Sequence, residues 1–256
     1  MHVERLPVEV PTRAPTGKTA CYVVGGDDAL LVDPAATDER VEARLDDVAH
    51  VAVTHHHPDH VGRVAEYARQ ADATVWCRYG REDAFAAATD AEPDRTFREG
   101  TVVETGDGPV TVRDTPGHAP EHVAFETGEG LVSGDLAVAA GSVVVGAPEG
   151  DMRAYVTSLR RVRGLAPERL YPGHGPVVED VRETCERLID HRLDRERRVL
   201  HAVESGSETV DAILAAAYDK DLAGVEDLAR ATVRAHLEKL DHEGRVRWDG
   251  DSAAPA

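Results

Sequence analysis

The sequence has few cysteines, few lysines and no long apolar run. Its cysteines, Cys21, Cys77 and Cys185, are odd in number and widely spaced. They predict neither a disulfide framework nor a cysteine zinc pair, and they fit a reducing cytoplasm. The longest apolar runs, such as Ala29–Val32, are far too short to cross a bilayer. The first residues form no apolar signal region, so we expect a cytoplasmic protein with no membrane contact.

Positive charge is also scarce, because 29 Lys and Arg residues stand against 48 Asp and Glu residues, for a net charge of −19. This balance excludes a generally basic surface for nucleic acid. Only Lys18, Lys220 and Lys239 among the basic residues are lysines. An acidic surface with arginine in place of lysine stays solvated in concentrated salt, so the composition predicts a halophilic protein. A GC-rich genome would explain the arginines but not the acidity.

The 256 residues are 41% hydrophobic, which is enough for one large domain or a medium domain with a small one. In the first 180 residues, short apolar strands alternate with helices, and turn residues separate strands such as 21–24 and 29–32. We expect a helix that begins at Asp59 and continues to Ala68, and another over residues 152–164. The alternation, with hairpins, predicts a mixed α/β sandwich as a domain over residues 1–180.

Residues 181–256 have a different character. The pattern predicts one long helix over 181–205, a second over 209–218 with Ser207 as its cap, a third over 225–242, and a strand at 245–248. These elements describe a small, mostly α, winged-helix-like domain. It has 12 basic and 17 acidic residues, which is unusual for a module that grips phosphates. Its one basic cluster, which we interpret as a solvated helix face with ion pairs, is Arg192, Arg195, Arg197 and Arg198.

The segment with the most chemical information is Thr54-His55-His56-His57-Pro58-Asp59-His60, where an apolar strand gives way to a helix. Residues two apart in an extended segment point to the same side, so His55 and His57 can bind one metal ion together. Asp59 and His60 begin the helix and can address a second ion. Imidazole and carboxylate are the ligands of catalytic zinc sites.

Three later loops supply further ligand types, each beside a glycine at the end of an expected strand. They carry His118, Asp135 and His174. Loops at one edge of a sheet converge, so these side chains can reach a common site. Asp33 ends another apolar strand before Pro34. It either orients a ligand or forms an ordinary Asp-Pro turn.

This set, in this order, resembles the metallo-β-lactamase superfamily over residues 15–178. The resemblance implies an αββα sandwich with two divalent metal ions. In this sequence His55, His57 and His118 would hold the first ion, Asp59, His60 and His174 the second, and Asp135 would bridge both. The ligand types favour zinc, although manganese or iron could occupy the same set.

The resemblance also implies a metal-dependent hydrolase. Two cations lower the pKa of a shared water, which then attacks a carbonyl or phosphorus centre. Asp59 would orient this nucleophile or move its proton. His122, four residues after His118, would donate a proton or support the site from behind.

The tail, with residues 236–246 above all, resembles the β-lactamase-like protein 2 branch. That resemblance implies a metal-dependent endoribonuclease on single-stranded RNA. The alternative is a glyoxalase II-like thioesterase acting on a small-molecule thioester or ester, since Pro116-Gly117-His118 with His122 and Asp33-Pro34 is similar to that group too. A winged-helix regulator is a third reading, but the acidic tail and complete ligand set argue against it. The sequence leaves a homodimer open.

Overall fold

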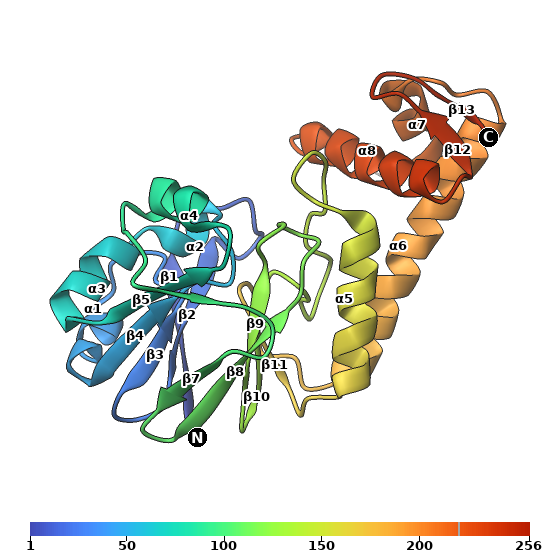
Figure 1. Ribbon diagram of the computed structural model, residues 1–256. Helices are drawn as coiled ribbons and strands as arrows, with labels where there is room; N and C mark the ends of the chain where they lie inside the picture. The colour runs from blue at the N-terminus through green and yellow to red at the C-terminus, as the bar shows by residue number, and fades with distance from the viewer. Residues whose placement is uncertain (220) are drawn as a thin grey trace.

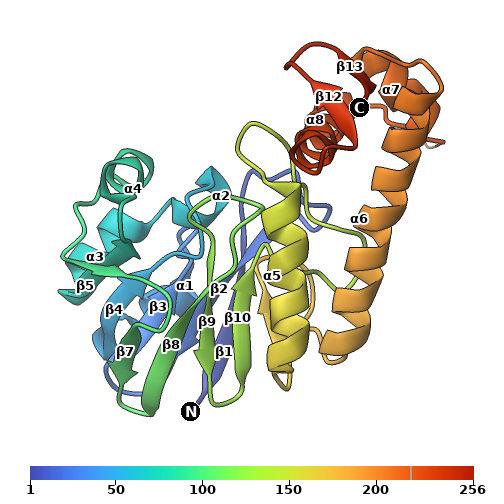
Figure 2. The same ribbon diagram turned by 45° about the vertical axis from the view of Figure 1, so that its right-hand side comes forward.

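The computed structural model describes residues 1–219 and 221–256. Two β-sheets lie face to face, helices cover the outer face of each, and a smaller unit of helices stands at the far end of helix α6 (Figures 1 and 2). The predicted αββα sandwich with a winged-helix-like tail is thereby confirmed. Among the described residues, no helix has both the length and the apolar character that crossing a membrane requires.

The first sheet has the strand order β1-β2-β3-β4-β5-β6. Strands β1 to β3 are antiparallel, whereas β3 to β6 run parallel. Their bounds are β1 Val3–Glu9, β2 Lys18–Val24, β3 Ala29–Val32, β4 Val48–Ala52, β5 Thr74–Arg78 and β6 Arg95–Phe97. The helices on this side are α1 Glu39–Glu42, a 3₁₀ turn at Leu45–Asp47, α2 Pro58–Val61, α3 Val64–Ala71 and α4 Glu82–Thr89.

The second sheet has the order β11-β10-β9-β8-β7 and is antiparallel except for the parallel pair β10 and β11. Its strands are β7 Val102–Thr105, β8 Gly108–Asp114, β9 Val123–Thr127, β10 Gly130–Gly134 and β11 Leu170–Pro172. The outer face is covered by α5 Met152–Leu165 and α6 Val181–Glu204, which share an apolar core with it. The tail adds α7 Val210–Ala217, α8 Glu226–His242, β12 Val246–Trp248 and β13 Ala253–Pro255.

Strands β2 and β3 are buried on both faces, which explains why their sequences are continuously apolar. Tyr22 and Leu30 point into the core between the sheets, where they meet Phe125. Their neighbours Cys21 and Leu31 point to the opposite side, into the core beneath the helices. The alternation follows from the two-residue period of a strand.

The helix predicted from Asp59 to Ala68 is interrupted in the structure. Helix α2 ends at Val61 and α3 begins at Val64. At Gly62 a Cβ atom would lie 2.4 Å from the carbonyl oxygen of Ala35, so the chain passes too close for any larger residue. The Arg63 amide donates to the Pro34 carbonyl at 2.8 Å instead of continuing the helix. This contact fixes α2 against the loop after β3.

The tail has its own apolar core, formed by the last turns of α6 together with α7, α8 and the β12–β13 ribbon. Thr209, rather than the predicted Ser207, caps α7, because its Oγ1 accepts the Ala212 amide at 3.3 Å. Helix α6 belongs to two cores. Cys185 and Leu188 pack beneath the second sheet, whereas Val199 and Val203 pack within the tail. The domain division at residues 180 and 181 therefore stays a prediction.

Candidate metal centre

The predicted ligands follow strands that end at the same edge of the sandwich. His55 and His57 come after β4, and His60 lies in α2. His118 follows β8, Asp135 follows β10 directly, and His174 lies two residues beyond β11. Because these strand ends lie together, residues more than a hundred positions apart become neighbours. Their side chains, and that of Asp59, form one continuous cluster.

Three overlapping groups of donor atoms make up the cluster, and within each group the atoms lie within 4.8 Å of one another. The groups are His55, His57 and His118; His55, His60 and Asp135; and Asp59, His60 and His174. Asp135 lies between the outer two groups. Its Oδ2 is 3.6 Å from Nε2 of His118 and 3.4 Å from Nε2 of His174. All seven predicted ligands are therefore brought together, while their binding roles stay predictions.

Outer hydrogen bonds fix which nitrogen of each ring faces the cluster. His118 donates from Nδ1 to the Val144 carbonyl at 2.6 Å, and His174 donates from Nδ1 to the Lys18 carbonyl at 2.8 Å. Both rings therefore turn Nε2 inward. His57 is reversed, since its Nε2 lies 3.2 Å from Oε2 of Glu149 and its Nδ1 lies 3.0 Å from Nε2 of His118. Such outer partners set ring orientation and ligand basicity.

Asp33 is the buried centre of the remaining outer contacts. Its carboxylate accepts the amide of Thr54 at 2.7 Å, the hydroxyl of Thr54 at 2.8 Å and Nδ1 of His60 at 2.9 Å. The Thr54 hydroxyl is also 3.0 Å from Nδ1 of His55. Asp33 thus orients His60 directly and His55 through Thr54. Of the two sequence-based readings of Asp33, the orienting one matches these contacts.

The cluster has the character of a cation site. The Nε2 atom of His60 and Oδ1 of Asp135 are buried and have no hydrogen-bond partner among the described residues. Burial lowers the pKa of His55 well below its usual range, and the neighbouring imidazoles act in the same direction. Burial opposes the charge on Asp135, yet His174, His60 and His118 hold its pKa far below its usual range. Neutral imidazole and carboxylate are the forms that bind a metal, so His55 and Asp135 fit one.

His122 lies behind Asp135, completely buried. Its Nε2 accepts the Asp135 amide at 3.1 Å, and its Nδ1 lies 2.8 Å from Oγ1 of Thr115. Burial, followed by the nearby His118, lowers the pKa of His122 to about 3. These contacts favour a neutral support for Asp135, and the predicted proton-donating role stays untested.

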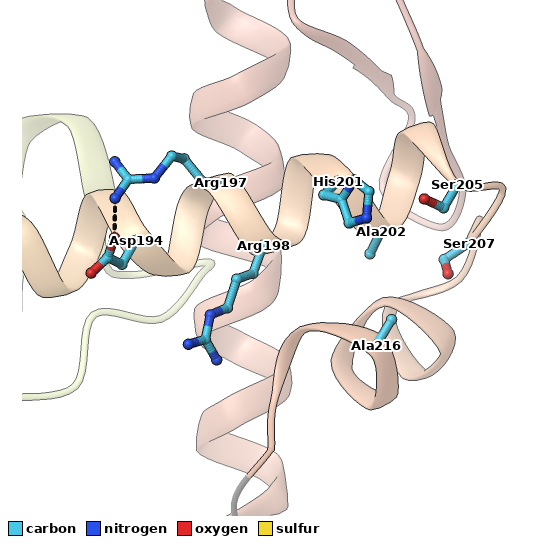
Figure 3. A pocket seen from close by; sticks show the side chains of 8 residues that line it. All are labelled: Asp194, Arg197, Arg198, His201, Ala202, Ser205, Ser207 and Ala216. Atoms are coloured by element: carbon cyan, nitrogen blue, oxygen red, sulfur yellow. Dashed lines mark hydrogen bonds and ion pairs between the residues drawn. The ribbon is translucent and has the colours of Figure 1, made fainter.

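The basic cluster of α6 forms contacts within the protein. Arg192 is buried and donates to the Val143 carbonyl, and Arg195 donates to the Ala217 carbonyl at 2.6 Å. The exposed pair is engaged too. Figure 3 shows Arg197 joined to Asp194, with Arg198 on the opposite side of the helix; Arg198 lies 2.8 Å from Asp219. The interpretation as a helix face with ion pairs fits Arg197 and Arg198, whereas Arg192 is an interior residue.

Two side chains beside the cluster belong to no motif that the sequence predicts. Glu149 contacts His57 as described, and the Thr12 hydroxyl donates to Oδ2 of Asp59 at 2.5 Å. They lie 92 and 47 positions from their partners and in irregular loops. No spacing or periodicity in the sequence links them to the histidine motif.

Comparison with known proteins adds independent information. Residues 14–174 match the family model described as the metallo-beta-lactamase superfamily. Residues 209–254 match the model of the beta-lactamase associated winged helix domain.

Individual relatives match most of the chain. A beta-lactamase-like protein 2 homolog of Drosophila melanogaster is 30% identical, over 90% of this chain and 84% of that protein. An atrochrysone carboxyl ACP thioesterase of Aspergillus fumigatus is 29% identical, over 73% of this chain and 60% of that protein. The solved structure of a metallo-beta-lactamase family protein from Thermus thermophilus has a TM-score of 0.78 at 24% identity, covering 99% and 98% of the two chains. This last likeness concerns the fold.

Proposed function

Because this chain belongs to the metallo-beta-lactamase superfamily and is a metal-dependent hydrolase, we propose that its histidine cluster binds two divalent cations side by side. The observation that carries this proposal is the overlap of the donor groups, in which His55 and His60 each belong to two. One cation would be held by His55, His57 and His118, the other by Asp59, His60 and His174, with Asp135 between them. The donor set suits zinc first, with manganese or iron as alternatives.

The cations, when bound, supply a water of lowered pKa and stabilise negative charge on a substrate oxygen. The chain's own residues determine how a substrate is handled. Asp59 would orient the attacking water or accept its proton. The Thr12 hydroxyl fixes this carboxylate by donating to Oδ2, the oxygen that lies 3.5 Å from Nε2 of His174. His122 holds the backbone of Asp135 in place through its Nε2.

For the substrate, we place a phosphodiester of single-stranded RNA first, which makes the protein an endoribonuclease-like phosphodiesterase. The support is the likeness to the beta-lactamase-like protein 2 homolog, which extends across the sandwich and the tail alike. The winged-helix tail would then contribute to holding the strand.

A specific observation favours the second candidate, a thioesterase. Among the exposed arginines, Arg13, Arg197 and Arg198 are each paired with an aspartate, and the chain as a whole has a net charge of −19. RNA binding depends on cations that can neutralise phosphates, whereas the carbonyl of a thioester needs none. The relative named as an acyl-carrier-protein thioesterase supports the same choice.

The two substrates are separated by a paired assay in concentrated KCl with added Zn²⁺ or Mn²⁺. One arm offers a single-stranded RNA oligonucleotide and the other lactoylglutathione. The control protein carries Asp59→Ala and His60→Ala. RNA cleavage that the control loses supports the first proposal, whereas thioester turnover without RNA cleavage contradicts it and selects the second. Inactivity in both arms contradicts both substrates.

We also propose a cytoplasmic location. All three cysteines, Cys21, Cys77 and Cys185, are free and buried, as a reducing compartment permits.

A further inference from the structure

One segment of the chain, residues 138–151 between β10 and α5, touches the cluster from outside. We call it the bridging segment. Its Val144 carbonyl accepts Nδ1 of His118 at 2.6 Å, and its Glu149 carboxylate lies 3.2 Å from Nε2 of His57. Two of the three residues of the first donor group are therefore held from behind by this segment. The Asp151 amide adds a third contact, donating at 2.8 Å to the carbonyl of Gly117, which precedes His118.

The same segment is fastened to the C-terminal helices on its other side. Arg192 of α6 donates from its guanidinium to the Val143 carbonyl, directly before Val144. Arg187, five residues earlier on α6, donates to the carbonyls of residues 138, 139 and 141. The Ala147 amide donates to the Ala231 carbonyl of α8 at 3.0 Å. The bridging segment is thus tied at three places to helices that carry the tail.

The group proposed to hold the second cation, which we call the second donor group, has outer partners of another origin; it consists of Asp59, His60 and His174. His60 is held by Asp33, His174 by the Lys18 carbonyl, and Asp59 by Thr12. These partners come from the first 33 residues of the chain. Apart from His55, which Asp33 reaches through Thr54, the two groups are therefore supported by different parts of the fold.

We propose that Arg192 and the contact of α8 with the bridging segment are positioning elements for the first cation group, so that the tail sets the affinity of His55, His57 and His118 for their cation. Arg192 is suited to this role because only 4% of it is exposed and because its charge reaches a carbonyl next to the one that orients His118. The inference rests on the proposed function, in which these residues hold a divalent cation. Removing a partner that orients a metal ligand lowers metal affinity about 10–100-fold.

The test uses the full-length protein and Zn²⁺ alone, in competition with a chromophoric chelator. Two backgrounds isolate the groups. Asp59→Ala with His174→Ala leaves the first group, and His57→Ala with His118→Ala leaves the second. In each background, Arg192→Met is compared with Arg197→Met, which removes a charge from an exposed position of the same helix. We expect Arg192→Met to weaken Zn²⁺ binding about 10–100-fold in the first background only, and Arg197→Met to weaken it in neither.

Because Arg192 is buried, a second perturbation reaches the bridging segment from α8. A Cβ atom at Gly146 would lie 2.7 Å from Cβ of Ala231, so Gly146→Ala pushes the segment away from the helix without touching a ligand. Ala231→Gly removes the atom that causes the collision. We expect Gly146→Ala to weaken the first group, and the double variant to recover the lost affinity. Ala231→Gly alone controls for its lower helix propensity, and circular dichroism establishes that each variant is folded.

The outcomes separate the two proposals. Unchanged first-group affinity in both Arg192→Met and Gly146→Ala overturns the inference and leaves the proposed function intact. Equal weakening of both groups also overturns it, because the effect would then be general. If the parent protein binds Zn²⁺ in neither background, the proposed function fails and the inference fails with it.

Discussion

Nδ1 of His60 lies 2.9 Å from Oδ2 of Asp33, and both side chains are inaccessible to solvent. Asp33 has a left-handed backbone, with φ of 53°, at the end of β3. This conformation is uncommon outside glycine, asparagine and aspartate, and here it turns the carboxylate toward α2. The pair connects the first sheet to the second donor group without any residue from the tail.

Asp33→Asn is expected to weaken Zn²⁺ binding at the second group by about 10–100-fold, because the neutral amide no longer orients His60 as a carboxylate does. Asparagine keeps the left-handed backbone accessible. Asp72→Asn is the matched control, since Asp72 is exposed and has φ of 51°. Competition with a chelator measures the Zn²⁺ affinity of both variants. Equal affinities in the two would contradict the role assigned to Asp33.

Removal of the metal should lower the melting temperature. A ligand at 100 times its dissociation constant stabilises the fold by about 2.7 kcal/mol, which for a chain of this size corresponds to roughly 5–10 °C. Calorimetry with and without a chelator provides the measurement. Asp135→Ala removes the carboxylate between the groups and should show a much smaller difference. A melting temperature indifferent to chelator in the parent protein would count against the cation site.

Stability should increase with salt. With a net charge of −19, the acidic side chains repel one another in dilute buffer. The distance over which salt screens this repulsion falls from about 10 Å at 0.1 M to about 3 Å at 1 M salt. We expect the melting temperature to increase steadily between 0.1 and 2 M KCl. Asp46→Asn with Glu92→Gln, at two exposed positions, should reduce the slope. A flat or falling profile would remove the support for salt adaptation.

A buried charge cluster makes the α6–α8 contact sensitive to pH. Burial raises the pKa of Glu196, but the contacts with His236 and Lys239 lower it by more than burial raises it. The pKa of Glu196 is therefore below its usual value. Lys239 donates to Glu196 at 2.9 Å. A carboxyl whose pKa is lower in the folded protein contributes stability above its unfolded pKa, and this contribution is lost as pH falls through the folded pKa.

Glu196→Gln should therefore destabilise the protein by about 1.5–3 kcal/mol at pH 7, the range for hydrogen bonds to charged groups. The difference from wild type should shrink as the pH falls below about 4. Urea unfolding at pH 7, 4 and 3 provides the comparison. Glu204→Gln, exposed on the same helix, should leave stability unchanged at every pH. A penalty for Glu196→Gln that persists in acid would assign it to packing.

The sequence was informative where function demands a fixed pattern. His55, His57, Asp59 and His60 stand in one motif, and the later ligands stand beside glycines at strand ends, so motif and strand periodicity together located the cluster. The residues that hydrogen-bond to the ligands from outside the cluster could not be predicted from the sequence. Glu149 and Val144 act through a loop whose path depends on α6 and α8, and no local rule predicts such a path.

The helices and strands, too, were predicted from the sequence only in part. Strands with a clear apolar run match their predicted ranges, since 29–32 is β3 and 21–24 is the second half of β2. Strand β1 was missed because its apolar residues are interrupted by charges and by Pro7, which is tolerated at the edge of a sheet. Strands β6 and β13, with three residues each, were also missed. Helix α4 was recoverable, since its alanine-rich sequence has high helix propensity.

The shared helix α6 has a consequence for how the molecule unfolds. Its 24 residues span about 36 Å, with Leu188 in one apolar core and Val203 in the other. Melting the tail would strip Val203 of its neighbours, and melting the sandwich would do the same to Leu188. Neither core can unfold without shortening α6, on which the other core depends. Sandwich and tail therefore form one cooperative unit, and a single transition should report the loss of both.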